Sequence, residues 1–599
     1  MELLDLDGVI EKGVFEIPSY QRGYAWQERQ LKDFWNDLEH VSKLGDKFHY
    51  MHSLTLRELE NDFENSAFEI IDGQQRLATS LILLGLLAKT TQNKDPKYSL
   101  INLEPILSYK YYGLSEAFRA ITEEENDLEA FKTSFYAKNL IEAYEFFKEK
   151  ISDTPIEVLE KMFDALIKKM LFSVVGLNDN RIDPFSSFET INNRGKDLST
   201  LELLKNRLHF VAHKICEGKK LEKLQQEIND TYTLIYHDLR QFEDDHLERF
   251  LKHFVAYYYG EKGDFKKRLL EMEFNAHKRY TVNTTFSDEY EKIDDLLFYL
   301  SYSSKVWNFL HTLDDEELRI EITPKMRNLL DKMRRLNALS DNAFLPLLLS
   351  LLTIQRAGKS ANEQPYTTQE LEGLLEYLER FGFLVYGVAG KNTAKNEWIE
   401  LAFKAIQAYR FWGDKITIED LPTLEKNFFK GNYSGLELLE ENIHSLKNTE
   451  KWYQWGKALN YLLYEYELHH NPETTLNFDG SIESIEHILP QNPDQGYSAK
   501  EKNWAKNPNI VHALGNLLLM AKNANSSLSN KPFDEKRKEY LKGSYSEKEV
   551  AKNASFGVVQ IKERSEKLLD FLIARYRIAE LVGESVIKAF KNALLKDIK

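Results

Sequence analysis

A short carboxy-terminal stretch holds the residue types that hydrolysis of a phosphodiester requires. Glu486 and His487 stand side by side, Asn516 lies in a Leu-Gly-Asn-Leu run, and Asn525 precedes Lys531 in an Asn- and Ser-rich turn. A neutral histidine can activate water as a general base. The oxygens of Glu486 and Asn525 suit Mg²⁺ or Mn²⁺, which neutralise the charge developing on phosphate. These residues indicate metal-dependent phosphodiester hydrolysis.

Two strands and a helix would have to position these residues. Residues 482–489 are strand-like, residues 513–520 form a second apolar run, and helices follow the Asn-rich turn. We therefore expect a ββα metal finger embedded in helices, with the carboxylate and the histidine at the end of its first strand. Alone, a Glu-His pair is more often a surface or packed core pair, and such a turn is more often an ordinary loop. The order of the motifs along the chain favours the finger.

A second set of candidate residues lies in the first 210 positions. It comprises three blocks in which arginine stands beside amide or glycine residues, namely Gln21-Arg22, Asp72-Gly73-Gln74-Gln75-Arg76 and Asn193-Arg194. Arginine recognises phosphate oxygens in a bidentate manner, and a glycine before a helix lets backbone N–H groups approach an anion. Each block alone is more often a turn with a structural arginine. Because no Walker A sequence occurs, these blocks predict a phosphate site that is not a P-loop.

The pattern around these blocks predicts a small mixed sheet followed by helices. Residues 13–18, 48–56 and 68–71 are strand-like, and residues 170–176 are a strand that could join them. Beyond residue 124 the apolar residues otherwise recur with helical spacing. We expect a multidomain, predominantly α chain with a small N-terminal mixed α/β domain at 1–210, a helical connecting domain at 211–450, and a finger-bearing domain at 451–599.

Both sets of motifs resemble GmrSD-type, modification-dependent (type IV) restriction endonucleases in their single-chain form. Glu486-His487-Ile488-Leu489-Pro490, Leu514-Gly515-Asn516-Leu517 and the Asn525 turn are similar to their HNH (His-Me finger) nuclease domain. The three N-terminal blocks look like their ParB-like domain, which binds and hydrolyses nucleoside triphosphates. We expect the resemblance to extend over the full chain.

The resemblance implies a role for each candidate residue. His487 would be the general base, Glu486 and Asn525 would belong to the metal site, Asn516 would orient the finger, and Lys531 would contact phosphate. The nucleotide, ATP, GTP or another triphosphate, would be bound by Gln21, Arg22, Asp72, Gly73, Gln75, Arg76, Asn193 and Arg194. The sequence departs from the family in two places. Asn525 replaces a histidine of the usual finger, and His52 stands where a small residue such as glycine is expected.

The resulting hypothesis is a phage-defence endonuclease that cuts double-stranded DNA carrying modified cytosine, hydroxymethylated or glucosylated, under nucleotide control. Two alternatives stay open at this point. One is a nucleotide-regulated nuclease that senses phosphorothioate DNA. The other is a non-catalytic DNA-binding or regulatory module with a vestigial nuclease fold. The family also implies a homodimer.

The charge of the chain is unevenly distributed. Its 599 residues include 79 Lys+Arg and 95 Asp+Glu, a net of −16, which by itself argues against a nucleic-acid partner. Residues 491–599 hold 20 Lys+Arg and 13 Asp+Glu, a net of +7, which leaves −23 for residues 1–490. The basic end carries the candidate finger, where contacts to DNA phosphates should concentrate.

Composition also bounds the location of the protein. Cys216 is the single cysteine, so an intramolecular disulfide and a multi-cysteine zinc site are excluded and a reducing compartment is favoured. The N-terminus lacks the basic and apolar blocks of a signal peptide. The longest apolar stretches, 81–88 and 343–354, are shorter than the roughly 20 residues that a membrane helix needs. We expect a cytoplasmic protein with no membrane partner.

Overall fold

The computed structural model describes residues 2–59, 66–93, 95–99, 106–110, 113–177, 198–242, 244–278, 280, 288–358, 364–474, 483–493 and 496–599. The chain divides into two compact units, an N-terminal unit, Met1–Asp314, and a C-terminal unit, Asp315–Lys599. The division lies inside the segment that the sequence assigns to a helical connector. The expected boundaries after residues 210 and 450 stay predictions.

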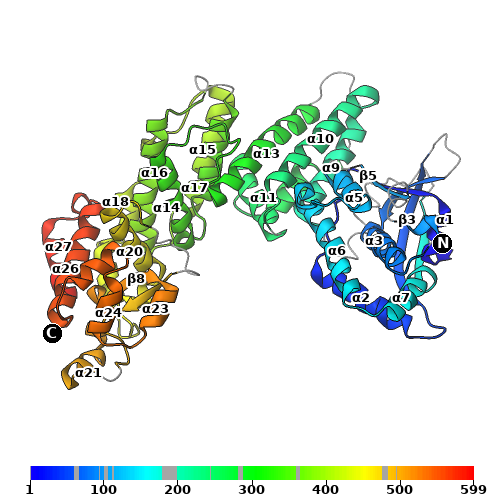
Figure 1. Ribbon diagram of the computed structural model, residues 1–599. Coiled ribbons are helices and arrows are strands. Elements are labelled where there is room, and N and C mark those ends of the chain that lie inside the picture. The colour runs from blue at the N-terminus through cyan, green and yellow to red at the C-terminus, as the bar shows by residue number, and fades with distance from the viewer. Residues whose placement is uncertain are drawn as a thin grey trace. The chain divides into compact units, whose positions relative to one another are not determined.

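A six-stranded mixed sheet forms the centre of the first part of the N-terminal unit (Figure 1). Its spatial order is β1-β6-β3-β4-β2-β5, with antiparallel pairing in β1–β6 and β3–β4 and parallel pairing elsewhere. The strands are β1 (Glu2–Leu4), β2 (Val14–Ile17), β3 (His49–Leu59), β4 (Ala67–Asp72), β5 (Leu107–Tyr109) and β6 (Met170–Gly176). The four strands expected from the sequence are all present, and Met170–Gly176 does join the sheet.

Helices that follow each other in the chain cover this sheet and extend beyond it. Helices α2 and α7 contact the strands β3 and β6, and α3 packs on α6 and α7. Helix α3 is apolar on nearly its whole surface and is buried accordingly, as its sequence predicts. The helices of this unit are α1 (Leu6–Lys12), α2 (Glu28–Ser42), α3 (Gln74–Thr90), α5 (Leu114–Thr122), α6 (Phe135–Ser152), α7 (Ile156–Lys168), α9 (Thr200–Ile215), α10 (Gly218–Asp238), α11 (Asp244–Tyr259), α12 (Phe265–Lys267) and α13 (Asp288–Thr312).

The C-terminal unit is helical apart from one two-stranded sheet. Its first helices are α14 (Pro324–Ser340), α15 (Leu345–Ala357), α16 (Thr368–Phe381), α17 (Lys395–Gln407), α18 (Leu424–Phe428), α19 (Gly435–His444) and α20 (Lys457–His470). The strands β7 (Glu483–His487) and β8 (Leu517–Ala521) pair in antiparallel register. Around them lie α21 (Ala499–Ala505), α22 (Pro508–Val511), α23 (Lys522–Leu528), α24 (Phe533–Tyr540), α25 (Tyr545–Ala551), α26 (Val558–Arg575) and α27 (Glu584–Leu595).

The order strand, strand, helix that the sequence predicts is present, because α23 follows β8 directly and packs on both strands. The apolar run at 513–520 is only partly a strand. Its first half forms a single 3₁₀ turn, η9 (Leu514–Asn516), and the strand begins at Leu517. The backbone N–H of Gly515 donates to the Ser565 hydroxyl, and its carbonyl accepts from Arg564, so these groups bond to α26.

Candidate active site

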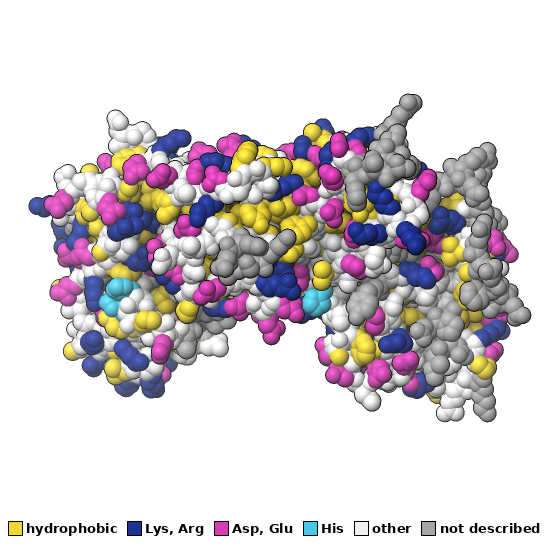
Figure 2. Space-filling model, turned by 90° about the horizontal axis from the view of Figure 1, so that it is seen from above, with side chains coloured by type: hydrophobic (Ala, Val, Ile, Leu, Met, Phe, Trp, Pro, Cys, Tyr) yellow, Lys and Arg dark blue, Asp and Glu magenta, His cyan; other side chains and the backbone are white. Residues whose placement is uncertain are grey.

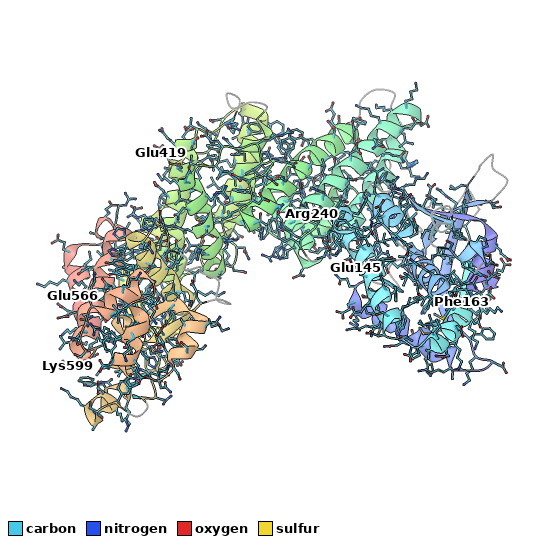
Figure 3. All side chains as sticks on the ribbon, in the orientation of Figure 1. Glu145, Phe163, Arg240, Glu419, Glu566 and Lys599 are labelled. Carbon is cyan, nitrogen blue, oxygen red and sulfur yellow. The ribbon has the colours of Figure 1, made fainter. Side chains whose placement is uncertain are left out.

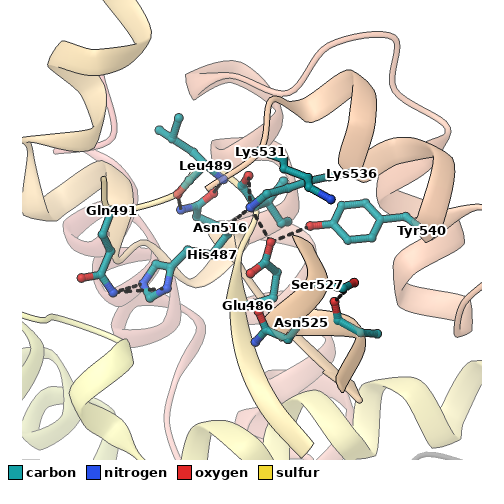
Figure 4. Close-up of polar contacts among 12 residues, drawn as sticks. Glu486, His487, Leu489, Gln491, Asn516, Asn525, Ser527, Lys531, Lys536 and Tyr540 are labelled. Carbon is teal, nitrogen blue, oxygen red and sulfur yellow. Dashed lines mark hydrogen bonds and ion pairs between the residues drawn. The ribbon is translucent and has the colours of Figure 1, made fainter. Parts of the chain in front are cut away.

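Glu486 and His487 end strand β7 and are both buried. Successive residues of a strand point to opposite faces of the sheet. Figure 4 shows the consequence, with Glu486 pointing toward Lys536 and Tyr540 and His487 pointing toward Gln491. Although Glu486 and His487 are adjacent in sequence, their side chains therefore contact different sets of residues.

Asn516 fixes the chain just after His487. Its Oδ1 accepts a hydrogen bond of 2.8 Å from the Leu489 backbone N–H, and its Nδ2 donates to the carbonyls of Leu489 (2.9 Å) and Val511 (2.7 Å). The side chain is fully buried, so these three bonds are not in competition with water. The amide thus joins the end of β7 to the turn before β8, and its role in orienting the finger stays a prediction.

The Glu486 carboxylate lies in an ion pair with Lys536 of α24. The Lys536 Nζ also donates to the His487 carbonyl at 2.9 Å, and the Tyr540 hydroxyl donates to Glu486 Oε1 at 3.0 Å. Burial raises the pKa of Glu486 and lowers the pKa of Lys536, while the pair interaction opposes both shifts. Because oxygens surround the Lys536 Nζ, the arrangement favours a charged ammonium beside a charged carboxylate.

The His487 ring meets a second histidine that the sequence analysis did not single out. His487 Nε2 lies 3.0 Å from His512 Nδ1, and the Tyr453 ring packs on both imidazoles. Burial, reinforced by His512 and Lys536, lowers the pKa of His487 to about 3, so the ring is neutral near pH 7. No short-range signal marks His512, because it is 25 residues from His487 and its spacing from the motifs is set by the fold.

Asn525 lies on the same side of β7 as Glu486. Its Nδ2 donates to the Ser484 hydroxyl at 2.7 Å, and Ser484 and Glu486 are two residues apart on one strand. Lys531 is exposed in the turn between α23 and α24, and its backbone carbonyl accepts from the Tyr497 hydroxyl. The fold therefore brings Asn525 to the Glu486 face and leaves the Lys531 side chain at the surface.

Gly515 shows why this turn needs glycine. A Cβ atom placed there would lie 2.0 Å from the Ile561 carbonyl oxygen and 2.6 Å from the Ser565 backbone nitrogen. Helix α26 can therefore approach the η9 turn only where no side chain intervenes. Arg564 of the same helix donates to the carbonyls of Gly515 and Leu517, which ties the turn to the helix.

In the N-terminal unit, the candidate glutamines hold a loop against the sheet and α3. Gln21 donates to the Ile70 carbonyl, and Gln75 both accepts from the Ala25 backbone N–H (2.8 Å) and donates to the Gly23 carbonyl (2.9 Å). Gln74, to which the sequence analysis assigns no role, donates to the Arg22 carbonyl at 3.1 Å. These amides place the segment that carries Arg22, which is itself buried.

Asp72, Gly73 and Arg76 form the junction between β4 and α3. Arg76 Nη2 lies 3.3 Å from Asp72 Oδ2 and donates to the Ser53 carbonyl at 2.8 Å. Gly73 has φ +100°, and a Cβ there would lie 2.9 Å from that same carbonyl oxygen, so glycine is required. The structure brings these three candidates together, whereas Asn193 and Arg194 lie outside the described residues.

His52, which stands where the resemblance leads us to expect a small residue, is not buried in the sheet. It is exposed, with φ +63°, where the pairing of β3 with β6 shifts register. This left-handed backbone is the reason that glycine suits the position. Its ring lies 5.3 Å from that of Tyr50.

Comparison with known families gives a match at each end of the chain. The N-terminal domain of GmrSD restriction endonucleases matches residues 3–209, and the C-terminal domain of GmrSD restriction endonucleases matches residues 439–571. The chain belongs to the GmrSD restriction endonuclease family. No curated protein matches it significantly. As a GmrSD family member it is a restriction endonuclease whose substrate is DNA.

The two family domains hold the two described clusters. The GmrSD N-terminal match contains the Asp72-Gly73-Arg76 junction, and the GmrSD C-terminal match contains β7, η9, β8 and α23. Within the described residues, no three His, Cys, Asp or Glu side chains gather as a metal-binding group. Glu486 and Asn525 carry hard oxygen donors, the type that a divalent cation takes, on the same side of β7. Glu486 Oε1 is bonded to the Lys536 ammonium and the Tyr540 hydroxyl, so a cation there would compete with Lys536 for this carboxylate.

The donor chemistry of the N-terminal cluster also fits a nucleotide. Over the described positions, Gln21 Oε1, Gln74 Oε1 and Arg76 Nε are buried atoms without a hydrogen-bond partner. Buried polar atoms of this kind are ordinarily bonded. A ligand with hydroxyl, amino and phosphate groups would supply partners for both kinds of atom.

The surface of the protein carries charges of both signs and, in the C-terminal unit, a cavity. Acidic and basic side chains are interspersed on the face seen in Figure 2. In the C-terminal unit a cavity of about 650 Å³ is lined by residues that include Glu370, Lys415 and Glu419, the last labelled in Figure 3. Lys415 and Glu370 form an ion pair of 2.7 Å there.

No helix among the described residues has the length and apolar character needed to span a membrane.

Proposed function

We propose that this chain is a type IV endonuclease that cuts DNA carrying modified cytosine, with His487 as its general base and with nucleotide hydrolysis as its control. The observation that carries the proposal is the placement of His487. Its buried ring lies at the end of β7 against His512, and Asn516 holds the backbone that follows it.

The chemistry assigned to His487 is activation of a water molecule. The ring nitrogen takes a proton as the water oxygen attacks phosphorus, the bond to the leaving oxygen breaks, and that oxygen is protonated from solvent. A charged His487 would have no lone pair for this step. Burial keeps the ring neutral, and the same lowering of its pKa makes the ring a weaker base than an exposed histidine.

Mg²⁺ or Mn²⁺ would be held by Glu486 and Asn525 and would neutralise the charge that develops on the phosphate. Lys531 is proposed to contact a neighbouring phosphate, because its side chain is exposed in the turn after α23. The net charge of +7 over residues 491–599 supports DNA binding at this end of the chain.

The N-terminal domain is proposed to bind and hydrolyse ATP, GTP or another nucleoside triphosphate. Arg22 and Arg76 would contact phosphate oxygens, Asp72 would hold the Arg76 guanidinium in place, and the backbone at Gly73 would face the anion at the start of α3. Asn193 and Arg194 would complete the site. Hydrolysis would regulate cleavage.

The experiment that tests the nuclease is digestion of phage genomes that contain unmodified, hydroxymethylated, glucosylated or phosphorothioate DNA. It is run with Mg²⁺ or Mn²⁺, with and without nucleotide. We expect cleavage of the DNAs with modified cytosine and loss of cleavage in His487→Ala, whereas the exposed His469→Ala control cleaves as the wild type does. Cleavage confined to phosphorothioate DNA would contradict the cytosine specificity, and cleavage by His487→Ala would contradict the catalytic assignment.

The second experiment tests the nucleotide site. Asp72→Ala and Arg76→Ala should suppress release of phosphate from ATP and GTP, while the exposed Lys538→Ala should not. Unchanged turnover in both site variants would remove the nucleotide assignment. Absence of any metal-dependent cleavage by the wild type would favour a non-catalytic DNA-binding module. A homodimer in the cytoplasm is part of the same proposal, and light scattering of the purified chain measures its oligomeric state.

A further inference from the structure

His512 contacts the proposed general base directly. It follows α22 and is 8% exposed, as is His487. The His487 Nε2 and His512 Nδ1 atoms are 3.0 Å apart, and the two rings meet edge to face with centroids 5.1 Å apart. Tyr453 covers both rings, with its centroid 4.9 Å from that of His487 and 5.9 Å from that of His512. The pair is thus held in one geometry by packing.

A hydrogen bond between two imidazole nitrogens needs one N–H and one lone pair. If His512 donates from Nδ1, the neutral His487 ring carries its own proton on Nδ1 and has no lone pair left for water. If His487 donates from Nε2, its Nδ1 keeps a lone pair and can act as a base. The direction of this one bond therefore decides whether His487 can accept a proton.

We propose that His512 is a positioning residue that accepts the His487 Nε2–H and so keeps the lone pair of the base on Nδ1. Gln491 Nε2 lies 3.4 Å from both ring nitrogens of His487, so it does not set this direction. The direction follows from the closer contact of 3.0 Å between Nε2 and His512, which leaves Nδ1 as the nitrogen whose lone pair a water molecule can reach. The Gln491 side chain is exposed, and its contact with the ring is long (Figure 4). A water molecule can therefore replace it at Nδ1.

The same bond serves the step after proton transfer. When water gives its proton to His487 Nδ1, the ring becomes a cation, and its Nε2–H bond to the neutral His512 becomes charge-assisted. The orienting partner of a catalytic histidine acts in this way in hydrolases where the partner is a carboxylate. In this chain the acceptor is a neutral imidazole, which orients the base without adding a negative charge beside a DNA phosphate.

This inference rests on the proposed function of His487, and its test compares two substitutions at position 512. His512→Leu keeps an apolar side chain under Tyr453 but has no acceptor. His512→Asn places an Oδ1 acceptor near the position of Nδ1. The matched control is His469→Leu at an exposed histidine. Single-turnover cleavage of modified DNA is measured over a range of DNA concentrations with the full chain.

We expect His512→Leu to lower the maximal cleavage rate by about 100-fold, the scale of general-base catalysis, with the DNA concentration at half-maximal rate unchanged. His512→Asn should stay within about tenfold of the wild type, and His469→Leu should equal it. Hydrogen exchange of peptides from β7 and β8 verifies that each variant is folded.

Two outcomes would overturn the inference while the proposed function stands, provided that the wild type cleaves and His487→Ala does not. One is a His512→Leu rate equal to that of the wild type. The other is an equal loss in His512→Asn and His512→Leu although both retain wild-type protection, because the acceptor would then have no part. Cleavage by His487→Ala would instead remove the proposed function itself.

Discussion

Lys536 and Glu486 form an ion pair in the interior of the C-terminal unit, with side-chain exposures of 0% and 5%. The Lys536 ammonium bonds to the carboxylate and to the His487 carbonyl, so one cation joins α24 to the end of β7. Removing two charges from water costs free energy that their attraction only partly offsets. We therefore expect the ion pair to fix the position of α24 against the end of β7 and to add little to the net stability of the unit.

Replacement of Lys536 by methionine should strongly destabilise the finger. The Glu486 carboxylate would stay buried without its cation, which costs about 3–5 kcal/mol. Hydrogen exchange of β7 and α24 peptides in the full chain measures this loss. The exposed Lys538→Met should have no effect, and adding Glu486→Leu to Lys536→Met should restore much of the protection. If the single and double variants were equally unprotected, the loss would not come from an unpaired carboxylate.

Asn516→Ala should loosen the loop that follows His487. The substitution leaves one backbone N–H and two carbonyls of Leu489 and Val511 without their buried partner, and each costs roughly 1–3 kcal/mol. We expect loss of cleavage together with faster hydrogen exchange in β7 and η9. Asn523→Ala, at an exposed position of α23, is the control. Retained cleavage in Asn516→Ala would show that the loop is held by other contacts.

Gly515→Ala should separate α26 from η9. The added Cβ would lie 2.0 Å from the Ile561 carbonyl oxygen, where neither backbone can give way easily. Overpacking of this kind costs about 1–3 kcal/mol or more. In Gly373→Ala the new Cβ would meet a flexible Ile418 side chain at 3.4 Å inside α16, so this control should unfold no earlier than the wild type. Thermal unfolding of both variants is the measurement.

The buried His209 should cause the stability of the N-terminal unit to fall as the pH falls below 7. Burial, reinforced by Lys205, lowers the pKa of His209 to about 3, and its Nε2 lies 3.2 Å from Asn229 Oδ1. Between pH 6.5 and 3 the unfolded histidine binds a proton that the folded one does not, so stability falls as pH falls. From pH 7.5 to 5.5 this contribution amounts to about 1.4 kcal/mol.

His209→Gln retains an Nε2 donor for Asn229 and cannot titrate. Hydrogen exchange of α9 peptides, corrected for the intrinsic effect of pH on exchange, should therefore depend less on pH in this variant than in the wild type. Equal pH dependence in the two proteins would mean that the folded-state pKa of His209 is not lowered.

Some of this protein could be predicted from sequence because the relevant information is local. Residues 170–176 were predicted to be a strand that could join the N-terminal sheet, and Met170–Gly176 is that strand. The order of Glu486-His487, Asn516 and the Asn525 turn predicted two strands followed by a helix, and that order is present. The same motifs resembled the GmrSD family, whose C-terminal domain matches this part of the chain. Hydrophobic period and turn residues act over a few positions, so they can be read without the fold.

Other features were decided only by tertiary packing. In the sequence Glu486 and His487 form one adjacent pair, whereas in the folded chain the pleat of β7 directs their side chains to opposite faces of the strand. Lys536 reaches Glu486 across 50 residues, and His512 reaches His487 across 25. Such contacts arise where α24 and the turn after α22 pack on β7, and no fixed spacing records them. The types of the reacting residues were therefore determined by the sequence, whereas their partners and protonation states were decided by burial in the folded chain.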